Sequence, residues 1–75
     1  MLKTSDIKFS KFKEDIVLTF YFTLNDWTTD KCIVYDIKKP SKWACDNSYD
    51  KRTASKIQKT IYNIIKTRKE LICIL

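Results

Sequence analysis

The chain is short and basic, and it lacks residues that many enzyme sites require. It has 75 residues, with 15 Lys and Arg against 9 Asp and Glu, and it contains no Gly and no His. This length leaves room for one domain, residues 1–75, with one small core. Without Gly the usual phosphate-binding loops cannot form, and without His the most common general base and metal ligand are missing. We therefore expect a non-enzymatic protein with no cofactor and no metal site.

Three cysteines, Cys32, Cys45 and Cys73, occur without any C-x-x-C pair. The odd number argues against a disulfide framework, and no fourth Cys or His ligand exists for a closed zinc site. We expect reduced thiols and a cytoplasmic location in a host cell, with one incidental disulfide or a metal bridge between chains as the alternative. No run approaches the roughly 20 apolar residues of a membrane-spanning helix, so no membrane partner is expected.

Alternating apolar residues predict a sheet over about residues 6–38. The clearest alternation lies in 16–24, and shorter strands are predicted at 6–12 and 31–37. Residues 25–30 are predicted as a loop, because their Asn, Asp and Thr side chains bond locally to the backbone. The short connection favours an antiparallel hairpin.

The two faces of this sheet are expected to have different neighbours. On the second strand, the even-numbered apolar positions are predicted to face a helix, namely Ile16, Leu18, Phe20, Phe22 and Leu24. The opposite face would carry Val17, Tyr21, Cys32 and Val34, with no second helix left to cover it. We hypothesise that this face or an open sheet edge binds a protein partner or forms a homodimer. A half-wetted sheet with scattered apolar residues is the alternative.

The second half of the chain changes its pattern. Residues 39–52 are predicted as a loop, and residues 53–74 as a helix with isoleucines on one side and lysines on the other. Either Asp50, or Ser55 with Gln58 in a capping box, is expected to cap its N-terminus. The predicted fold class is therefore α+β: a small three-stranded antiparallel β-meander, in the order β-β-β-α, packed by one C-terminal amphipathic helix.

Positive charge is concentrated in the predicted loop and helix. Residues 38–69 carry ten basic and two acidic residues, whereas the rest of the chain carries five basic and seven acidic. Contacts with nucleic acid or an acidic surface are expected at Lys42, Lys51, Arg52, Lys56, Lys59, Lys66 and Arg68. Trp43 and Tyr49 lie among them and could stack on bases. The alternative is a solvated helix face that keeps the protein soluble.

The loop at 25–30 contains two carboxylates and a tryptophan. Asp26 and Asp30 are expected to form turns rather than to bind a metal ion. Trp27, between them, is either a binding anchor or, as we favour, a side chain folded over the open end of the core.

These features predict a binding protein. The leading hypothesis is a small phage or mobile-element protein that docks on a larger host complex, one that handles nucleic acid, and inhibits or modulates it. Anti-CRISPR inhibitors share this size and composition, by analogy only. The partner-binding residues would be Tyr21, Val34, Trp27 and Trp43. The alternative is a small basic regulator that binds nucleic acid directly through its lysine-rich loop and helix.

Overall fold

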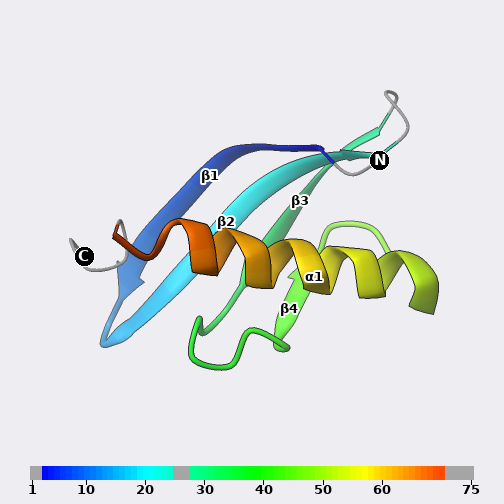
Figure 1. Ribbon diagram of the computed structural model, residues 1–75. Helices are drawn as coiled ribbons and strands as arrows, with labels where there is room; N and C mark the ends of the chain where they lie inside the picture. The colour runs from blue at the N-terminus through cyan, green and yellow to red at the C-terminus, as the bar shows by residue number, and fades with distance from the viewer. Residues whose placement is uncertain (1–2, 25–27, 71–75) are drawn as a thin grey trace.

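A four-stranded antiparallel sheet carries one helix on one of its faces (Figure 1). The computed structural model describes residues 3–24 and 28–70. The elements are β1 (Lys3–Phe12), β2 (Asp15–Leu24), β3 (Thr28–Val34), β4 (Trp43–Cys45) and α1 (Lys51–Thr67). The strands lie in the sheet in chain order. The α+β class is as predicted, but the three-strand prediction is wrong, because β4 forms within the segment 39–52, for which the sequence predicts a loop.

The β1–β2 hairpin turns through two residues, Lys13 and Glu14, between the paired residues Phe12 and Asp15. Two-residue hairpins match the twist of the strands when the turn adopts positive φ angles, which Gly and Asn prefer. This chain has no Gly, and Lys13 takes the position of positive φ, with a φ of 56°. The turn therefore contains a residue that favours the left-handed conformation less than Gly or Asn does.

A β-bulge interrupts β1. Ser5 pairs with Tyr21 and Lys8 pairs with Thr19, so β1 contains one more residue than β2 over this stretch. Asp6, in the bulge, has a φ of 51°, a left-handed conformation that Asp tolerates better than most residues. A bulge and exposed lysines on an edge strand both discourage pairing with another chain. The outer edge of β1 is therefore poorly suited to the strand addition considered from the sequence.

The β2–β3 pairing decides which side chains enter the core. As predicted, Leu18, Phe20 and Phe22 are fully buried. Cys32 pairs with Phe20, and Val34 with Leu18, so both β3 residues share this face and are also fully buried.

The prediction that Cys32 and Val34 lie on an exposed outer face is therefore wrong. The sequence predicts a strand at 31–37, and the strand is found at Thr28–Val34. In the predicted strand 31–37, Ile33, Tyr35 and Ile37 form the more apolar side, but the register of the β2–β3 pairing determines which side of β3 is buried.

A disulfide joins β3 to the short edge strand β4. Cys32 and Cys45 are paired across the two strands, with their Cα atoms 4.0 Å apart, and their sulfur atoms are bonded. The prediction of reduced thiols is wrong for these two residues. The alternative, one incidental disulfide, is confirmed. The cysteines therefore no longer indicate a cytoplasmic location, because disulfides persist mainly in oxidising compartments.

Helix α1 covers the inner face of the sheet. Ile57, Ile61 and Ile64 lie one turn apart and are buried against the apolar residues of β2 and β3. The helix begins at Lys51, two residues before the predicted start, and its last residue is Thr67. The predicted extension to residue 74 reaches beyond the described residues.

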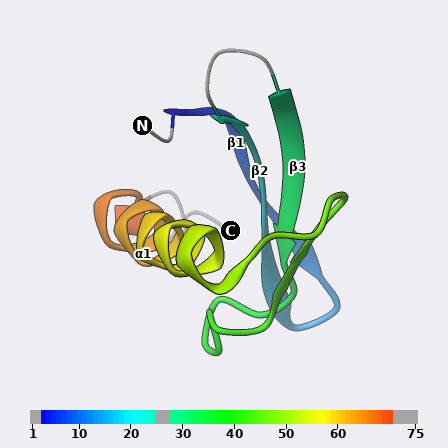
Figure 2. The ribbon, with the colours of Figure 1, turned by 90° about the vertical axis from the view of Figure 1, so that its right-hand side faces the viewer.

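The result is a two-layer arrangement, with α1 on one side of the sheet (Figure 2). The core lies between the layers and is completed by partly buried side chains, among them Ile7, Phe9 and Trp43. In the described part of the chain, no helix is long and apolar enough to cross a membrane.

Candidate polyanion-binding surface

The side of α1 that faces away from the sheet carries a line of basic residues. Arg52, Lys56, Lys59 and Lys66 are all exposed, and we call them the basic stripe. With Asn63 their spacing is 4, 3, 4 and 3 residues, which keeps them on one helical face. That face lies opposite the buried isoleucines. From Arg52 to Lys66 the stripe is about 21 Å long, at about 1.5 Å per residue.

Further exposed side chains add positive charge at the two ends of α1. Lys51 and Lys69 lie beside the basic stripe, whereas Arg68, the C-cap residue, follows Ile64 by four residues and lies on the isoleucine side. No acidic residue occurs between Lys51 and Lys69 in the sequence. Tyr62 lies between the levels of Lys59 and Lys66 and is 51% exposed. An aromatic ring among cations, open to solvent, can contribute a stacking or packing contact to a bound partner.

The first turn of α1 is positively charged, although the N-terminus of a helix favours negative charge. It has no acidic residue, and Lys51 and Arg52 occupy its first two positions. The N-terminal end of a helix dipole is positive, so a cation there is unfavourable by about 0.3–1 kcal/mol at low ionic strength. Helix stability alone therefore does not explain why these residues are basic.

Asp50 compensates for part of this effect. Its side chain accepts a hydrogen bond from the Thr53 amide at 2.9 Å, as an N-cap residue does. Hydrogen bonds from Thr53 lower the pKa of the Asp50 carboxyl. Of the two predicted caps, Asp50 is confirmed, and Ser55 lies inside the helix.

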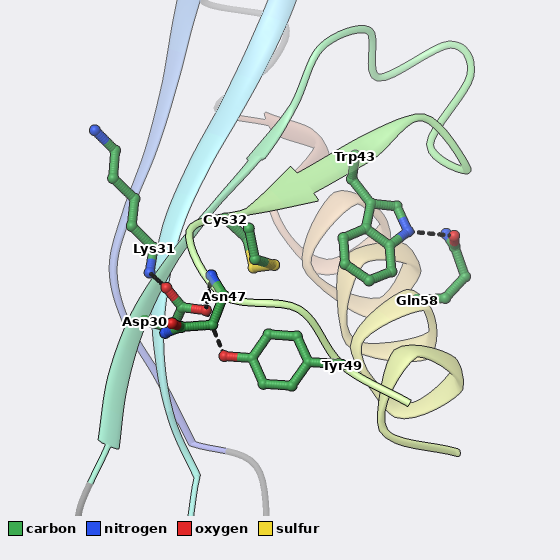
Figure 3. Close-up of a disulfide and its surroundings, with 8 residues drawn as sticks. Asp30, Lys31, Cys32, Trp43, Asn47, Tyr49 and Gln58 are labelled. Carbon is green, nitrogen blue, oxygen red and sulfur yellow. Dashed lines mark hydrogen bonds between the residues drawn. A yellow bond between two sulfur atoms is a disulfide. The ribbon is translucent and has the colours of Figure 1, made fainter. Parts of the chain in front are cut away.

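A buried carboxylate on β3 fixes the connection that leads into α1 (Figure 3). Asp30 is only 3% exposed. Its oxygens accept hydrogen bonds from the Lys31 amide at 2.8 Å, from the Asn47 amide at 3.2 Å and from the Tyr49 hydroxyl. Asn47 and Tyr49 belong to the segment between β4 and α1, so Asp30 ties the start of the helix to the sheet.

The same hydrogen bonds shift the titration of both side chains. Burial alone would raise the pKa of Asp30, but the hydrogen bonds from Tyr49, Lys31 and Asn47 outweigh it and hold that pKa below the ordinary value. Burial, and then the hydrogen bond and charge of Asp30, raise the pKa of Tyr49 to about 12. At neutral pH the pair is therefore a carboxylate and a neutral phenol. Asp30 stabilises the fold here and does not form the turn that the sequence predicts for it.

Trp43 fixes the middle of α1 to β4. Its indole Nε1 donates a hydrogen bond to Oε1 of Gln58 at 2.7 Å, and Nε2 of Gln58 donates to the carbonyl oxygen of Pro40 at 2.8 Å. Trp43 is half-buried and packs against the core. Its ring and the Tyr49 ring, which packs on Phe22 with centroids 5.6 Å apart, are engaged within the fold. Neither is placed as an open stacking platform.

The structure groups some of the predicted site residues and separates others. Lys51, Arg52, Lys56, Lys59, Lys66 and Arg68 are exposed along α1, and Lys42 is exposed in the loop before β4. Tyr21 is half-buried on the sheet face that points away from α1, and Val34 is in the core. Trp27 lies outside the described residues.

The sequence predictions do not include Tyr62, nor the structural role of Asp30. Tyr62 could have been found from its position among lysines on the polar side of the predicted helix. The role of Asp30 could not, because it depends on partners 17 and 19 residues later in the chain.

Within residues 3–24 and 28–70, no three His, Cys, Asp or Glu side chains group as metal ligands would. Comparison of the chain with family models, with curated proteins and with solved structures found no match.

Proposed function

We propose that this protein is a non-enzymatic nucleic-acid-binding protein that contacts phosphates through the basic stripe of α1. The observation that carries the proposal is the line of four exposed cations from Arg52 to Lys66, without a carboxylate among them, on a helix whose opposite side is fixed to the sheet. Such a line matches the repeated charges of a phosphate backbone, and binding would release counterions from it.

Two features support this function over a merely solvated helix face. A solvated face usually mixes charges of both signs, and residues 51–69 contain only basic ones. The basic first turn also opposes the helix dipole, which a face selected for stability would avoid. Because α1 is held by Trp43, Asp30 and the core, the stripe is presented on a rigid element rather than on a loop.

A second candidate function is docking on an acidic protein surface, with inhibition or modulation of a host complex as the consequence. The exposed ring of Tyr62 beside Lys59 and Lys66 favours it, because Tyr is enriched among the residues that dominate protein–protein binding energy. Charge would then steer association and contribute to specificity. The two functions use the same side of α1 and differ in the chemistry of the partner.

The experiment that tests the proposal is a binding measurement with the full chain. Fluorescein-labelled 20-base-pair DNA, single-stranded DNA and RNA are titrated by fluorescence anisotropy at low and near-physiological salt. Poly-L-glutamate of equal total charge serves as competitor. We expect binding that weakens steeply with salt and that poly-L-glutamate displaces only poorly.

Absence of binding at low salt would overturn the nucleic-acid proposal. Equally effective displacement by poly-L-glutamate would show that the stripe recognises any dense negative charge, which favours the acidic protein surface. A matched variant, Lys38→Ala with Lys39→Ala, removes basic residues away from α1 and is expected to bind like the wild type.

A further inference from the structure

The sheet face opposite α1 carries aromatic side chains that the core does not use. Among the described residues no helix covers this face (Figure 2). Phe12 and Tyr35 are 64% and 56% exposed. Strand alternation places Phe12 there, since Phe9 packs on the core. Tyr35 directly follows β3, and the hydrogen bond from its amide to the Lys42 carbonyl oxygen continues the β3–β4 pairing by one residue, which puts Tyr35 on the side opposite the buried Val34. Tyr21 lies between the buried Phe20 and Phe22 and points to the same side.

Lysines accompany these rings. Three of them are set on this outer face by cross-strand pairing, in the pairs Lys31–Tyr21, Lys8–Thr19 and Lys3–Thr23. A fourth, Lys42, adjoins Tyr35, whose amide donates to the Lys42 carbonyl oxygen at 3.2 Å. The carboxylates nearest these positions are Asp15, paired with Phe12, and Asp46, whose amide donates to the Lys31 carbonyl oxygen at 3.1 Å. Asp6 of the bulge, Glu14 of the hairpin turn, Asp36 after Tyr35 and Lys13, whose Nζ lies over the Phe12 ring at 5.7 Å from its centroid, are at the margin of the face. At the positions set by pairing, four lysines therefore accompany two carboxylates.

We propose that this outer face binds single-stranded nucleic acid, with Phe12, Tyr21 and Tyr35 as stacking surfaces for bases and the lysines as phosphate contacts. Exposed aromatic rings with lysines beside them are the combination that single strands require, because their unpaired bases have free faces. A duplex cannot use the rings, since its bases are stacked inside. The proposal extends the proposed function to a second surface, and it rests on that function only for the class of ligand.

Charge also argues against a second copy of this chain as the occupant. A two-fold symmetric contact places the same patch of both copies together. Lys3, Lys8, Lys31 and Lys42 of one copy would then approach their equivalents, whereas a polyanion would be attracted. Along β2 the face runs from Thr23 to Asp15, nine residues, and spans about 27 Å at about 3.4 Å per step. That length accommodates several nucleotides.

The test uses the variant Phe12→Ser with Tyr35→Ser, because both rings are exposed and their loss should leave the fold intact. The probes are fluorescein-labelled dT12, an abasic strand of the same length, and a 12-base-pair duplex. Ser48→Ala, an exposed position in the segment between β4 and α1, is the control. We expect the double variant to bind dT12 at least about tenfold more weakly, and Ser48→Ala to bind it within about twofold of the wild type.

The abasic strand separates stacking from charge. The wild type is expected to prefer dT12 to the abasic strand, and the double variant is expected to bind both alike. Backbone amide shifts from a two-dimensional NMR titration with dT12 should concentrate in β1, β2 and β3. Unchanged dT12 affinity in the double variant, or shifts confined to α1, would overturn the proposal.

Failure of this proposal can be told apart from failure of the function proposed for α1. Substitution of Lys56, Lys59 and Lys66 by Ala is expected to weaken duplex binding and to leave the preference for dT12 over the abasic strand in place. If the wild type sediments as a dimer that the Phe12 and Tyr35 substitutions dissociate, the outer face is an interface between copies, and the proposal is wrong.

Discussion

The hydroxyl of Tyr49 donates a hydrogen bond to the buried carboxylate of Asp30, which joins the segment before α1 to strand β3. The Asn47 amide donates to the same carboxylate oxygen. Together with the bond between Trp43 and Gln58, these hydrogen bonds fix the helix to the sheet at two places (Figure 3). The orientation of the basic stripe therefore depends on a few polar side chains as well as on the apolar core.

Asp30 should make the protein sensitive to acid. Its folded-state pKa is lowered, so its contribution to stability is present above the unfolded value of about 3.9 and is lost as the pH falls through the folded value. We expect the free energy of unfolding, from urea titrations, to fall as the pH decreases below about 4. In Asp30→Asn this part of the decrease should be absent, and an unchanged acid profile would show that Asp30 is not its source.

Tyr49 should make the protein sensitive to alkali. Its folded-state pKa is raised to about 12, so its contribution is fully present below the unfolded value near 10 and is lost as the pH rises through about 12. The absorbance of ionised tyrosine near 295 nm should show one residue that titrates late in the folded protein. In Tyr49→Phe that late step should disappear; if it persists, another tyrosine is responsible.

The sequence predicts those parts of the fold that show a regular spacing of apolar residues. The alternation in β2 and the helical spacing of Ile57, Ile61 and Ile64 both reflect local periodicity, and both predictions are confirmed. The predicted face of β3 is wrong, because the more apolar side of residues 31–37 is not the buried one, and only pairing with β2 decides which side enters the core. The short strand β4 has too few residues for a pattern.

The candidate site likewise has one part that could be predicted from the sequence and another that could not. The basic stripe is visible in the sequence, because helical spacing alone groups Arg52, Lys56, Lys59 and Lys66. The structure adds where that stripe faces and what fixes it. The position of Trp43 among lysines predicts a partner contact, yet its indole N–H is bonded to Gln58, 15 residues later. Contacts between distant segments leave no local signal.

The disulfide should contribute measurably to stability. Cys32 and Cys45 are 13 residues apart, and closing a loop of about this size is expected to stabilise a fold by about 3 kcal/mol. We expect dithiothreitol, or substitution of Cys32 and Cys45 together by Ala, to lower the urea midpoint of unfolding. Mass spectrometry after alkylation should show both cysteines unmodified until reductant is added, and modification without reductant would contradict the bond.

The measurement that tests the central claim most directly is the salt dependence of duplex DNA binding, for the wild type and for the variant with Lys56, Lys59 and Lys66 replaced by Ala. Each neutralised phosphate adds about 0.9 to the magnitude of the slope of log K against log salt concentration. If these lysines bind phosphates, the variant's slope should be shallower by about 0.9 for each phosphate that is no longer neutralised, with unchanged far-ultraviolet circular dichroism. An identical slope in the two proteins would contradict the assignment of α1 as the nucleic-acid-binding surface.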